Sequence, residues 1–218
     1  MLGDEQFLNW TRGWVSPPLR QEDNDLARDV RICQLFLYTL ARLTNAQNIL
    51  EIGVADGSTT MALLKAAEET GGIVHSVDPS PCDHAVELVT ALGYMPLWRF
   101  YQMKSQFFFQ NDGQECGYDL VFIDGDHTVD AVTLDVTKSL EALRVDGYCV
   151  LHDWHPASEE VIRQHPLSDE FGVMKGVRTA LYRTFHGAIS SMAFLPVGPG
   201  ADNHSEGAFL VLQKKAMK

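Results

Sequence analysis

The sequence predicts a doubly wound α/β fold, in which helices cover both faces of a mostly parallel sheet. Two observations carry this prediction. Short apolar runs typical of strands alternate with segments whose apolar residues recur at helical spacing. The strand segments are also nearly continuous apolar runs, which is typical of parallel strands buried on both faces. A chain of 218 residues is long enough to bury the core of one such domain.

The elements can be justified in chain order. Strands are expected at 48–53, 73–77, 97–102, 118–123 and 148–151, with helices at 58–69, 83–92 and 129–143. Gly93 suits the left-handed conformation that closes the second of these helices. One helix over 173–185 then precedes two more strands, 191–197 and 207–213, and their short connection favours an antiparallel pair. The prediction is a Rossmann-like, seven-stranded sheet that is mostly parallel and has an antiparallel C-terminal strand.

Residues 1–45 precede this alternation and are expected to form an irregular arm followed by a helix. Trp10 and Trp14 mark the arm, and apolar residues at helical spacing between Val30 and Leu43 mark the helix. The whole chain, 1–218, is interpreted as a single domain whose core is 46–218. Three interpretations of the arm stay open: it caps the crevice, it makes a homodimer contact, or it packs onto the core.

The composition excludes several classes of partner. With 29 acidic and 17 basic side chains, the formal net charge is −12. A surface this negative repels phosphate backbones, so nucleic acid is not expected as a substrate. No apolar run approaches the roughly 20 residues of a membrane span, and the acidic N-terminal segment does not resemble a signal peptide. A cytoplasmic protein is therefore expected, with its four scattered cysteines reduced and structural.

A turn bracketed by glycines follows the first strand. Gly53 and Gly57 flank it, and glycine lets the backbone approach a ligand closely. The next helix begins at Ser58, where free N–H groups can face a carboxylate. Glu51, at the end of the first strand, is expected to attract an ammonium group, and Asp78, at the end of the second, to bind both ribose hydroxyls. S-adenosylmethionine presents all of these groups.

A nicotinamide dinucleotide is the competing ligand, because its sites also combine a glycine-rich turn with a later acid. That fingerprint needs G-x-G-x-x-G, whereas this turn reads GVADG over 53–57. Glu51 and Asp56 would lie awkwardly beside a pyrophosphate, but they suit a cationic sulfonium that carries an amino acid. The sequence therefore favours S-adenosylmethionine.

A second polar cluster follows the fourth and fifth strands. Because ligands lie beyond the carboxyl ends of the strands in such sheets, both parts are expected to converge beside the cofactor. Asp124 and Asp153 are the candidate ligands of a divalent metal such as Mg²⁺, with His152 or Asp126 completing the set. His127 is the candidate general base, because imidazole titrates near neutral pH.

A simpler interpretation of part of this cluster stays open. An acid at the end of a strand often caps the following helix. Asp126 or Thr128 would then do no more than begin the helix at 129.

Four stretches carry a resemblance to a known family: LEIGVADGSTT (50–60), VHSVDP (74–79), YDLVFIDGDHTVDAVTLDV (118–136) and LRVDGYCVLHDW (143–154). The chain resembles class I S-adenosylmethionine-dependent methyltransferases. It is similar to the metal-dependent O-methyltransferases related to the macrocin and mycinamicin sugar enzymes, and more distantly to catechol O-methyltransferase. The similarity covers roughly residues 46–185, and IDGDH followed by HDW is its most specific part.

This resemblance implies roles for individual residues. Asp124 would bind Mg²⁺ beside the cofactor, and His127, where catechol relatives carry a lysine, would be the base. The remaining metal ligands map onto His152 and Asp153, and Ser105 would contact the adenine. His152 departs from the pattern, because the family has an acid there and imidazole suits Mn²⁺ or later transition ions better than Mg²⁺. The choice between Mg²⁺ and Mn²⁺, and metal dependence itself, stay open.

The expected activity is methyl transfer from S-adenosylmethionine to a hydroxyl group of a small molecule. Two alternatives stay open beside it. A metal-independent methyltransferase would act by proximity and a base, and a non-catalytic protein would keep the fold only as a cofactor-binding module. The acceptor itself is not indicated by the sequence.

Overall fold

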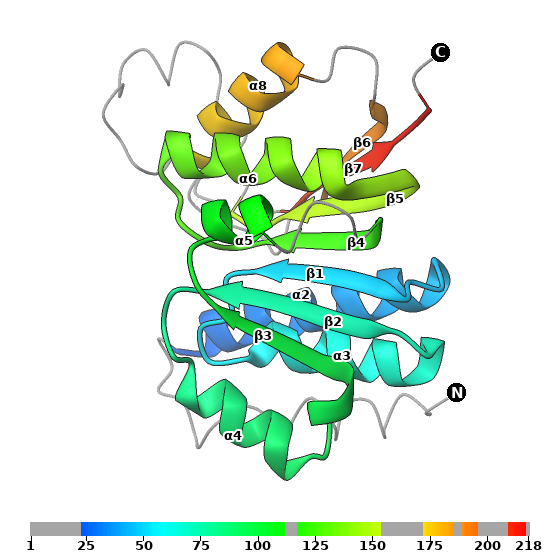
Figure 1. Ribbon diagram of the computed structural model, residues 1–218, viewed down its shortest axis with the longest axis vertical. Helices are drawn as coiled ribbons and strands as arrows, with labels where there is room; N and C mark the ends of the chain where they lie inside the picture. Colours follow the sequence, from blue (N-terminus) through cyan, green and yellow to red (C-terminus); the bar gives the residue numbers. More distant parts are fainter. Residues whose placement is uncertain (1–22, 112–116, 154–171, 185–188, 196–208, 217–218) are drawn as a thin grey trace.

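A seven-stranded sheet forms the centre of the protein, in the order β3-β2-β1-β4-β5-β7-β6 (Figure 1). The computed structural model describes residues 23–111, 117–153, 172–184, 189–195 and 209–216. Strands β1 to β5 pair parallel, and β7 pairs antiparallel with both β5 and β6. The predicted fold class is therefore confirmed.

The bounds of the elements agree closely with those expected from the sequence. The strands are β1 (Asn48–Ile52), β2 (Ile73–Asp78), β3 (Trp98–Gln102), β4 (Tyr118–Ile123), β5 (Leu143–Leu151), β6 (Ile189–Leu195) and β7 (Phe209–Lys214). The helices are α2 (Asp23–Leu43), α3 (Ser58–Thr70), α4 (Asp83–Ala91), the short 3-10 helix η1 (Met95–Leu97), α5 (Ser105–Asn111), α6 (Val129–Ala142) and α8 (Gly172–Thr184).

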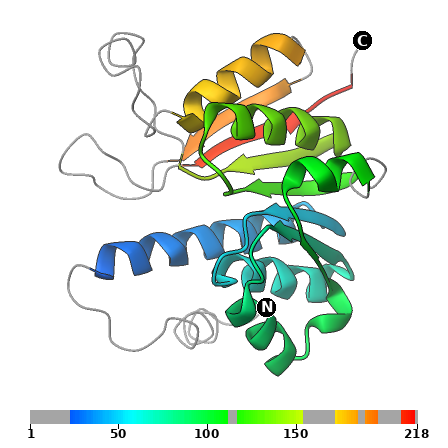
Figure 2. The ribbon, with the colours of Figure 1, turned by 60° about the vertical axis from the view of Figure 1, so that its left-hand side comes forward.

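Two apolar clusters, one on each face of the sheet, explain why the central strands are apolar throughout. Neighbouring residues such as Ile49 and Leu50 of β1 enter opposite clusters, because side chains alternate along a strand. Helices α2, α3 and α4 contribute to the first cluster, and α5, α6 and α8 to the second. Within the second group, α6 and α8 pack side by side (Figures 1 and 2). All six residues of β4 are buried as a result.

The strand order reverses between β1 and β4, since β2 and β3 lie to one side of β1 and β5 to the other. Consecutive crossovers leave on opposite sides at such a point, and a crevice opens beyond the carboxyl ends of the strands. The segments that follow β1 and β4 carry Gly53, Gly57, Asp124 and His127 of the predicted site residues. The topology therefore brings them together.

The structure differs from the expected elements in two places. β5 begins at Leu143 rather than at 148, because Asp146, at φ 66°, forms a bulge inside the strand instead of a turn before it. Helix α5 was not predicted. Its seven residues are too few to show a helical period, although Phe108 and Phe109 are buried.

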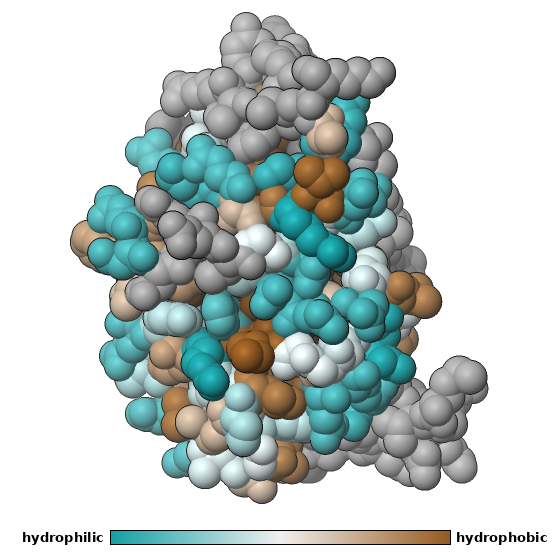
Figure 3. Space-filling view, turned by 45° about the vertical axis from the view of Figure 1, so that its right-hand side comes forward, coloured by the Kyte–Doolittle hydropathy of each residue, from teal (hydrophilic) through white to brown (hydrophobic). Residues whose placement is uncertain are grey.

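Three cysteines of the described part of the chain, Cys33, Cys82 and Cys149, are buried and form no disulfide with one another. Among the described residues, no helix combines the length and apolar character that a membrane span requires. Figure 3 shows one face on which hydrophilic residues dominate and hydrophobic ones form small separate groups. Trp10, Trp14 and Cys116 lie outside the described residues.

Candidate functional site

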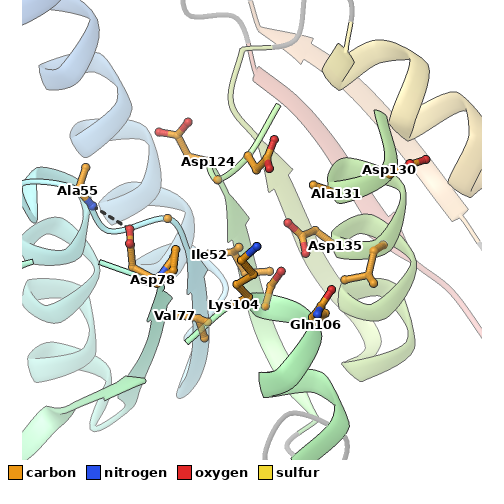
Figure 4. Close-up of a pocket in the computed structure, with 16 residues that line it drawn as sticks. Ile52, Ala55, Val77, Asp78, Lys104, Gln106, Asp124, Asp130, Ala131 and Asp135 are labelled. Carbon is orange, nitrogen blue, oxygen red and sulfur yellow. Dashed lines mark hydrogen bonds between the residues drawn. The ribbon is translucent and has the colours of Figure 1, made fainter. Parts of the chain in front are cut away.

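A cavity of about 480 Å³ lies at the point where the strand order reverses (Figure 4). Residues after β1, β2, β3 and β4 line it, together with one side of α6. Of the predicted cofactor residues, four line this cavity: Gly53, Asp78, Ser105 and Asp124. Its charged lining consists of one lysine and five aspartates: Lys104, Asp78, Asp124, Asp126, Asp130 and Asp135. The cavity therefore favours a ligand that carries positive charge.

The two glycines of the β1–α3 turn are required by the packing of the chain itself. Gly53 has φ 91° and Gly57 has φ 86°, a left-handed region that strains other residues. A Cβ atom on Gly53 would stand 2.0 Å from the Asp124 carbonyl oxygen, and one on Gly57 would stand 2.7 Å from the Ala85 Cβ. The turn thus lies directly against the end of β4, beside Asp124.

Glu51 lies beneath this turn and is not part of the cavity lining. Its carboxylate accepts hydrogen bonds from three hydroxyls: Thr59 at 2.7 Å, Thr60 at 2.8 Å and Ser76 at 2.7 Å. The side chain is fully buried, and burial raises its pKa to about 7 although the three hydroxyls act in the opposite direction. Glu51 therefore joins the start of α3 to β2 through these hydroxyls.

The buried charge of Glu51 gives the stability of the protein a pH dependence. Because its folded-state pKa of about 7 exceeds the ordinary 4.5, the folded state loses stability as the pH rises between these values and no further above them. At pH 8 we expect the free energy of unfolding of Glu51→Gln, measured by urea denaturation, to exceed that of the wild type by up to about 3 kcal/mol. At pH 4.5 the two free energies should be similar. The exposed Glu87 of α4 provides the control, Glu87→Gln. If the difference in free energy of unfolding between Glu51→Gln and the wild type does not grow with pH, the raised pKa of Glu51 is contradicted.

Asp78 and Ser58 are both engaged by neighbouring groups of the chain. Asp78 accepts the N–H groups of Val54 at 2.9 Å, Ala55 at 3.3 Å and Ser80 at 2.8 Å. Burial would raise its pKa, but these donors hold the pKa below its usual range. The Ser58 N–H and hydroxyl both donate to Asp56, at 3.0 and 2.8 Å. The local aspartate therefore occupies the Ser58 N–H, one of the N–H groups at the start of α3 that were expected to face a ligand carboxylate.

The acid–histidine cluster comprises Asp124, His127, His152 and Asp153, and the structure brings all four together. His152 Nδ1 lies 3.5 Å from Asp124 Oδ1 and 3.2 Å from Asp153 Oδ2. His127 Nε2 lies 3.7 and 3.4 Å from the same two oxygens. The His152 side chain is 13% exposed, and its ring lies against Phe209, with centroids 5.3 Å apart. The convergence predicted from the strand ends is thus present.

In this cluster the carboxylates and the imidazoles each favour the charged form of the other. Burial would raise the pKa of Asp124, but the adjacent His127 and His152 imidazoles hold it well below its usual range. Burial lowers the pKa of His152, yet hydrogen bonding to Asp124 and Asp153 raises it to about 10. Hydrogen bonding to Asp124 likewise raises the pKa of His127, against the effect of burial. The pair of carboxylates therefore attracts positive charge strongly.

One set within the cluster fits a metal ion. Asp124, His152 and Asp153 each present one ligand atom, and these atoms lie within 4.8 Å of one another. Neighbouring ligands of an octahedral ion with bonds of about 2.1 Å are roughly 3 Å apart, close to the contacts of His152. His127 is not a member of this set, although its Nε2 atom lies close to the same two carboxylate oxygens. Asp126 is not a member either.

Asp126 and Thr128 follow the simpler interpretation. Asp126 accepts the Thr128 N–H at 2.8 Å, and the Thr128 hydroxyl accepts the Ala131 N–H at 3.4 Å. These contacts cap the start of α6. Asp126 still lines the cavity.

The sequence interpretation missed Asp135, which lines the cavity from α6 although its side chain is almost fully buried. A signal was present in the sequence. Asp135 shares the apolar stripe of α6 with Val132, Val136 and Leu140, where a charged residue is unexpected.

Comparisons with known proteins agree with this geometry. Residues 50–154 match the family model of a methyltransferase domain. Three solved structures share the fold over most of both chains. An O-methyltransferase of Streptomyces achromogenes, in complex with S-adenosylmethionine, has 17% identity, a TM-score of 0.66 and coverage of 98% of this chain and 100% of its own.

The other two structures contain S-adenosylhomocysteine. An O-methyltransferase of Bacillus cereus has 18% identity and a TM-score of 0.65, with 96% and 90% of the two chains covered. A methyltransferase of Podospora anserina has 16% identity and a TM-score of 0.65, with 97% and 87% covered. A comparison with curated proteins finds no significant match. Residues 50–154 are therefore similar to a methyltransferase domain, and the chain shares the fold of solved structures that bind S-adenosylmethionine or S-adenosylhomocysteine.

Proposed function

We propose that this enzyme transfers a methyl group to a hydroxyl oxygen of a small molecule, with a divalent metal bound by Asp124, His152 and Asp153. The observation that carries the proposal is the position of His127. Its Nε2 atom faces the same two carboxylate oxygens that would hold the metal. Asp124 belongs both to this set and to the cavity lining, so base, metal and methyl donor would meet at one place.

The acidic cavity supports S-adenosylmethionine as its ligand. This molecule carries a sulfonium and an ammonium group against one carboxylate, and the cavity has five aspartates and one lysine in its lining. In the proposed arrangement Asp78 faces the ribose and Ser105 the adenine, while Gly53 lets the backbone approach the methionine part. Glu51 and Gly57 act indirectly by holding the turn, and Ser58 begins the helix behind it.

In the proposed reaction the acid–histidine cluster takes one proton from the acceptor, and one methyl group moves from sulfur to the acceptor oxygen. The acceptor hydroxyl gives its proton to His127 Nε2, and its oxygen attacks the methyl carbon as the bond from carbon to sulfur breaks. The electron pair of that bond stays on sulfur, which leaves S-adenosylhomocysteine. A bound divalent ion would stabilise the negative charge that develops on the acceptor oxygen. Balancing the charge of Asp124 and Asp153 would also remove the attraction that raises the pKa of His127.

The charge of the protein supports a small acceptor. A net charge of −12 opposes a polyanionic substrate. Two adjacent oxygens on the acceptor, as in a catechol or a vicinal diol, would allow chelation at the metal set.

The experiment measures incorporation of tritiated methyl groups from S-adenosylmethionine into a panel of catechols, phenols and vicinal sugar diols. We expect an oxygen-methylated product, loss of turnover after exhaustive chelation, and recovery with Mn²⁺ or Mg²⁺. Turnover that survives chelation would replace this proposal with the metal-independent alternative. Binding of S-adenosylhomocysteine in calorimetry without methyl transfer to any acceptor of the panel would favour the non-catalytic cofactor-binding module.

A further inference from the structure

Asp135 is a buried acid in the wall of the cofactor cavity that the proposed chemistry does not use. It lies in the middle of α6, and its residue surface is only 2% exposed. Figure 4 shows its carboxylate directed into the space between the end of β1 and the start of α5. A Cβ atom on Gly125 would stand 3.9 Å from Asp135 Oδ2, which places the carboxylate close to the turn after β4.

Only part of this carboxylate is satisfied by the described residues. The Ser105 side chain forms a hydrogen bond with it, whereas Oδ1 has no hydrogen-bond partner among them. Burial raises the pKa of Asp135 to about 6, which still leaves it mainly ionised at neutral pH. A buried carboxylate oxygen without a donor is unfavourable. A ligand that fills the cavity and offers an N–H group would remove this penalty.

The arrangement of the cavity indicates which part of the ligand that is. Asp78, at the end of β2, is the residue proposed for the ribose, and Asp124 belongs to the acid–histidine cluster. The remaining wall is formed by the start of α5 and by α6, where Ser105, Gln106 and Asp135 line the cavity. The base of the nucleoside would occupy this part. Adenine carries an exocyclic amino group there, whereas hypoxanthine carries a carbonyl oxygen.

We propose that Asp135 accepts a hydrogen bond from the exocyclic amino group of adenine and so selects the adenosyl form of the cofactor. This inference rests on the proposed function, because it requires S-adenosylmethionine in this cavity. Asp135 thereby acts in specificity and takes no part in methyl transfer. A carboxylate facing a carbonyl oxygen would leave both acceptors unpaired, and sites of this kind reject such analogues strongly.

The test compares binding of S-adenosylhomocysteine and S-inosylhomocysteine by calorimetry. We expect the wild type to bind the adenosyl compound at least about 30-fold more tightly. In Asp135→Asn the ratio should fall to about threefold or less, because an amide can donate to the carbonyl oxygen of hypoxanthine. Glu141→Gln removes one negative charge from an exposed position of α6 outside the cavity lining, and its ratio should equal that of the wild type.

Two further outcomes keep the inference distinct from the proposed function. A wild type that binds both compounds equally, or an Asp135→Asn protein with an unchanged ratio, would overturn the role of Asp135 and leave the cofactor assignment intact. A wild type that binds neither compound would overturn both. If the variant does not fold, the wild type with an N6,N6-dimethyladenosyl analogue decides, because loss of the donor should weaken binding and unchanged affinity would refute the contact.

Discussion

Replacing His127 by alanine is expected to slow methyl transfer by a factor of about 10²–10⁴ while S-adenosylhomocysteine binds almost as before. Methyl transfer should be affected without cofactor binding because of where His127 lies. His127 does not line the cofactor cavity, and its Nε2 atom faces the carboxylate oxygens of Asp124 and Asp153 at 3.7 and 3.4 Å. Its side chain is 43% exposed, which leaves room for an acceptor to approach. The measurement is kcat with the best acceptor of the panel, together with the Kd of S-adenosylhomocysteine.

A matched substitution separates a base from a merely structural histidine. His84 is an exposed histidine of α4 that lies outside the cavity lining, so His84→Ala should keep full activity. The pH profile provides a second readout, because a base must be deprotonated. Activity of the wild type should rise with pH through the pKa of His127, and this limb should be absent from His127→Gln. A kcat of His127→Ala within twofold of the wild type would refute the assignment.

The extent to which the sequence predicted the fold depended on burial. The strand β4 was predicted with its observed bounds because both of its faces are covered and all six residues are buried. Five of the six are apolar or aromatic, and Asp119 accepts hydrogen bonds from backbone N–H groups. The bulge at Asp146 was not predictable in the same way, since a polar residue followed by glycine is equally typical of a turn. Helix α5 is stabilised by tertiary packing of Phe108 and Phe109, and seven residues carry no readable period.

In the candidate site, the features that follow from topology could be predicted from the sequence, whereas the local side-chain contacts could not. The convergence of Asp124 and His152 follows from the order of parallel strands, which a sequence pattern can indicate. The partners of Glu51 and Ser58 depend instead on neighbouring side chains, Thr59 and Asp56, that compete with any ligand for the same groups. Such competition is settled by distances of a few tenths of an ångström, so residue types alone could not decide it.

Replacing His152 by aspartate is expected to move the metal preference of the site from Mn²⁺ toward Mg²⁺. In the wild type one imidazole nitrogen, Nδ1, stands with one oxygen each from Asp124 and Asp153. Nitrogen ligands favour transition ions, whereas Mg²⁺ prefers oxygen. Packing of the His152 ring against Phe209 holds this nitrogen toward the carboxylates, so the ring is not free to turn away at little cost. The ratio of the Mg²⁺ and Mn²⁺ dissociation constants should therefore fall by about tenfold or more in His152→Asp.

Added negative charge could by itself tighten the binding of any cation, so the ratio is the quantity that matters. Free Mn²⁺ followed by electron paramagnetic resonance, with Mg²⁺ as competitor, measures both constants without any methyl acceptor. His84→Asp adds the same charge outside the cavity lining and should leave the ratio at its wild-type value. Equal ratios in the wild type and in His152→Asp would place the imidazole outside the coordination of the metal. Asp124 and Asp153 would then have to hold the ion with water alone, and the departure at position 152 would have a purely structural cause in its packing on Phe209.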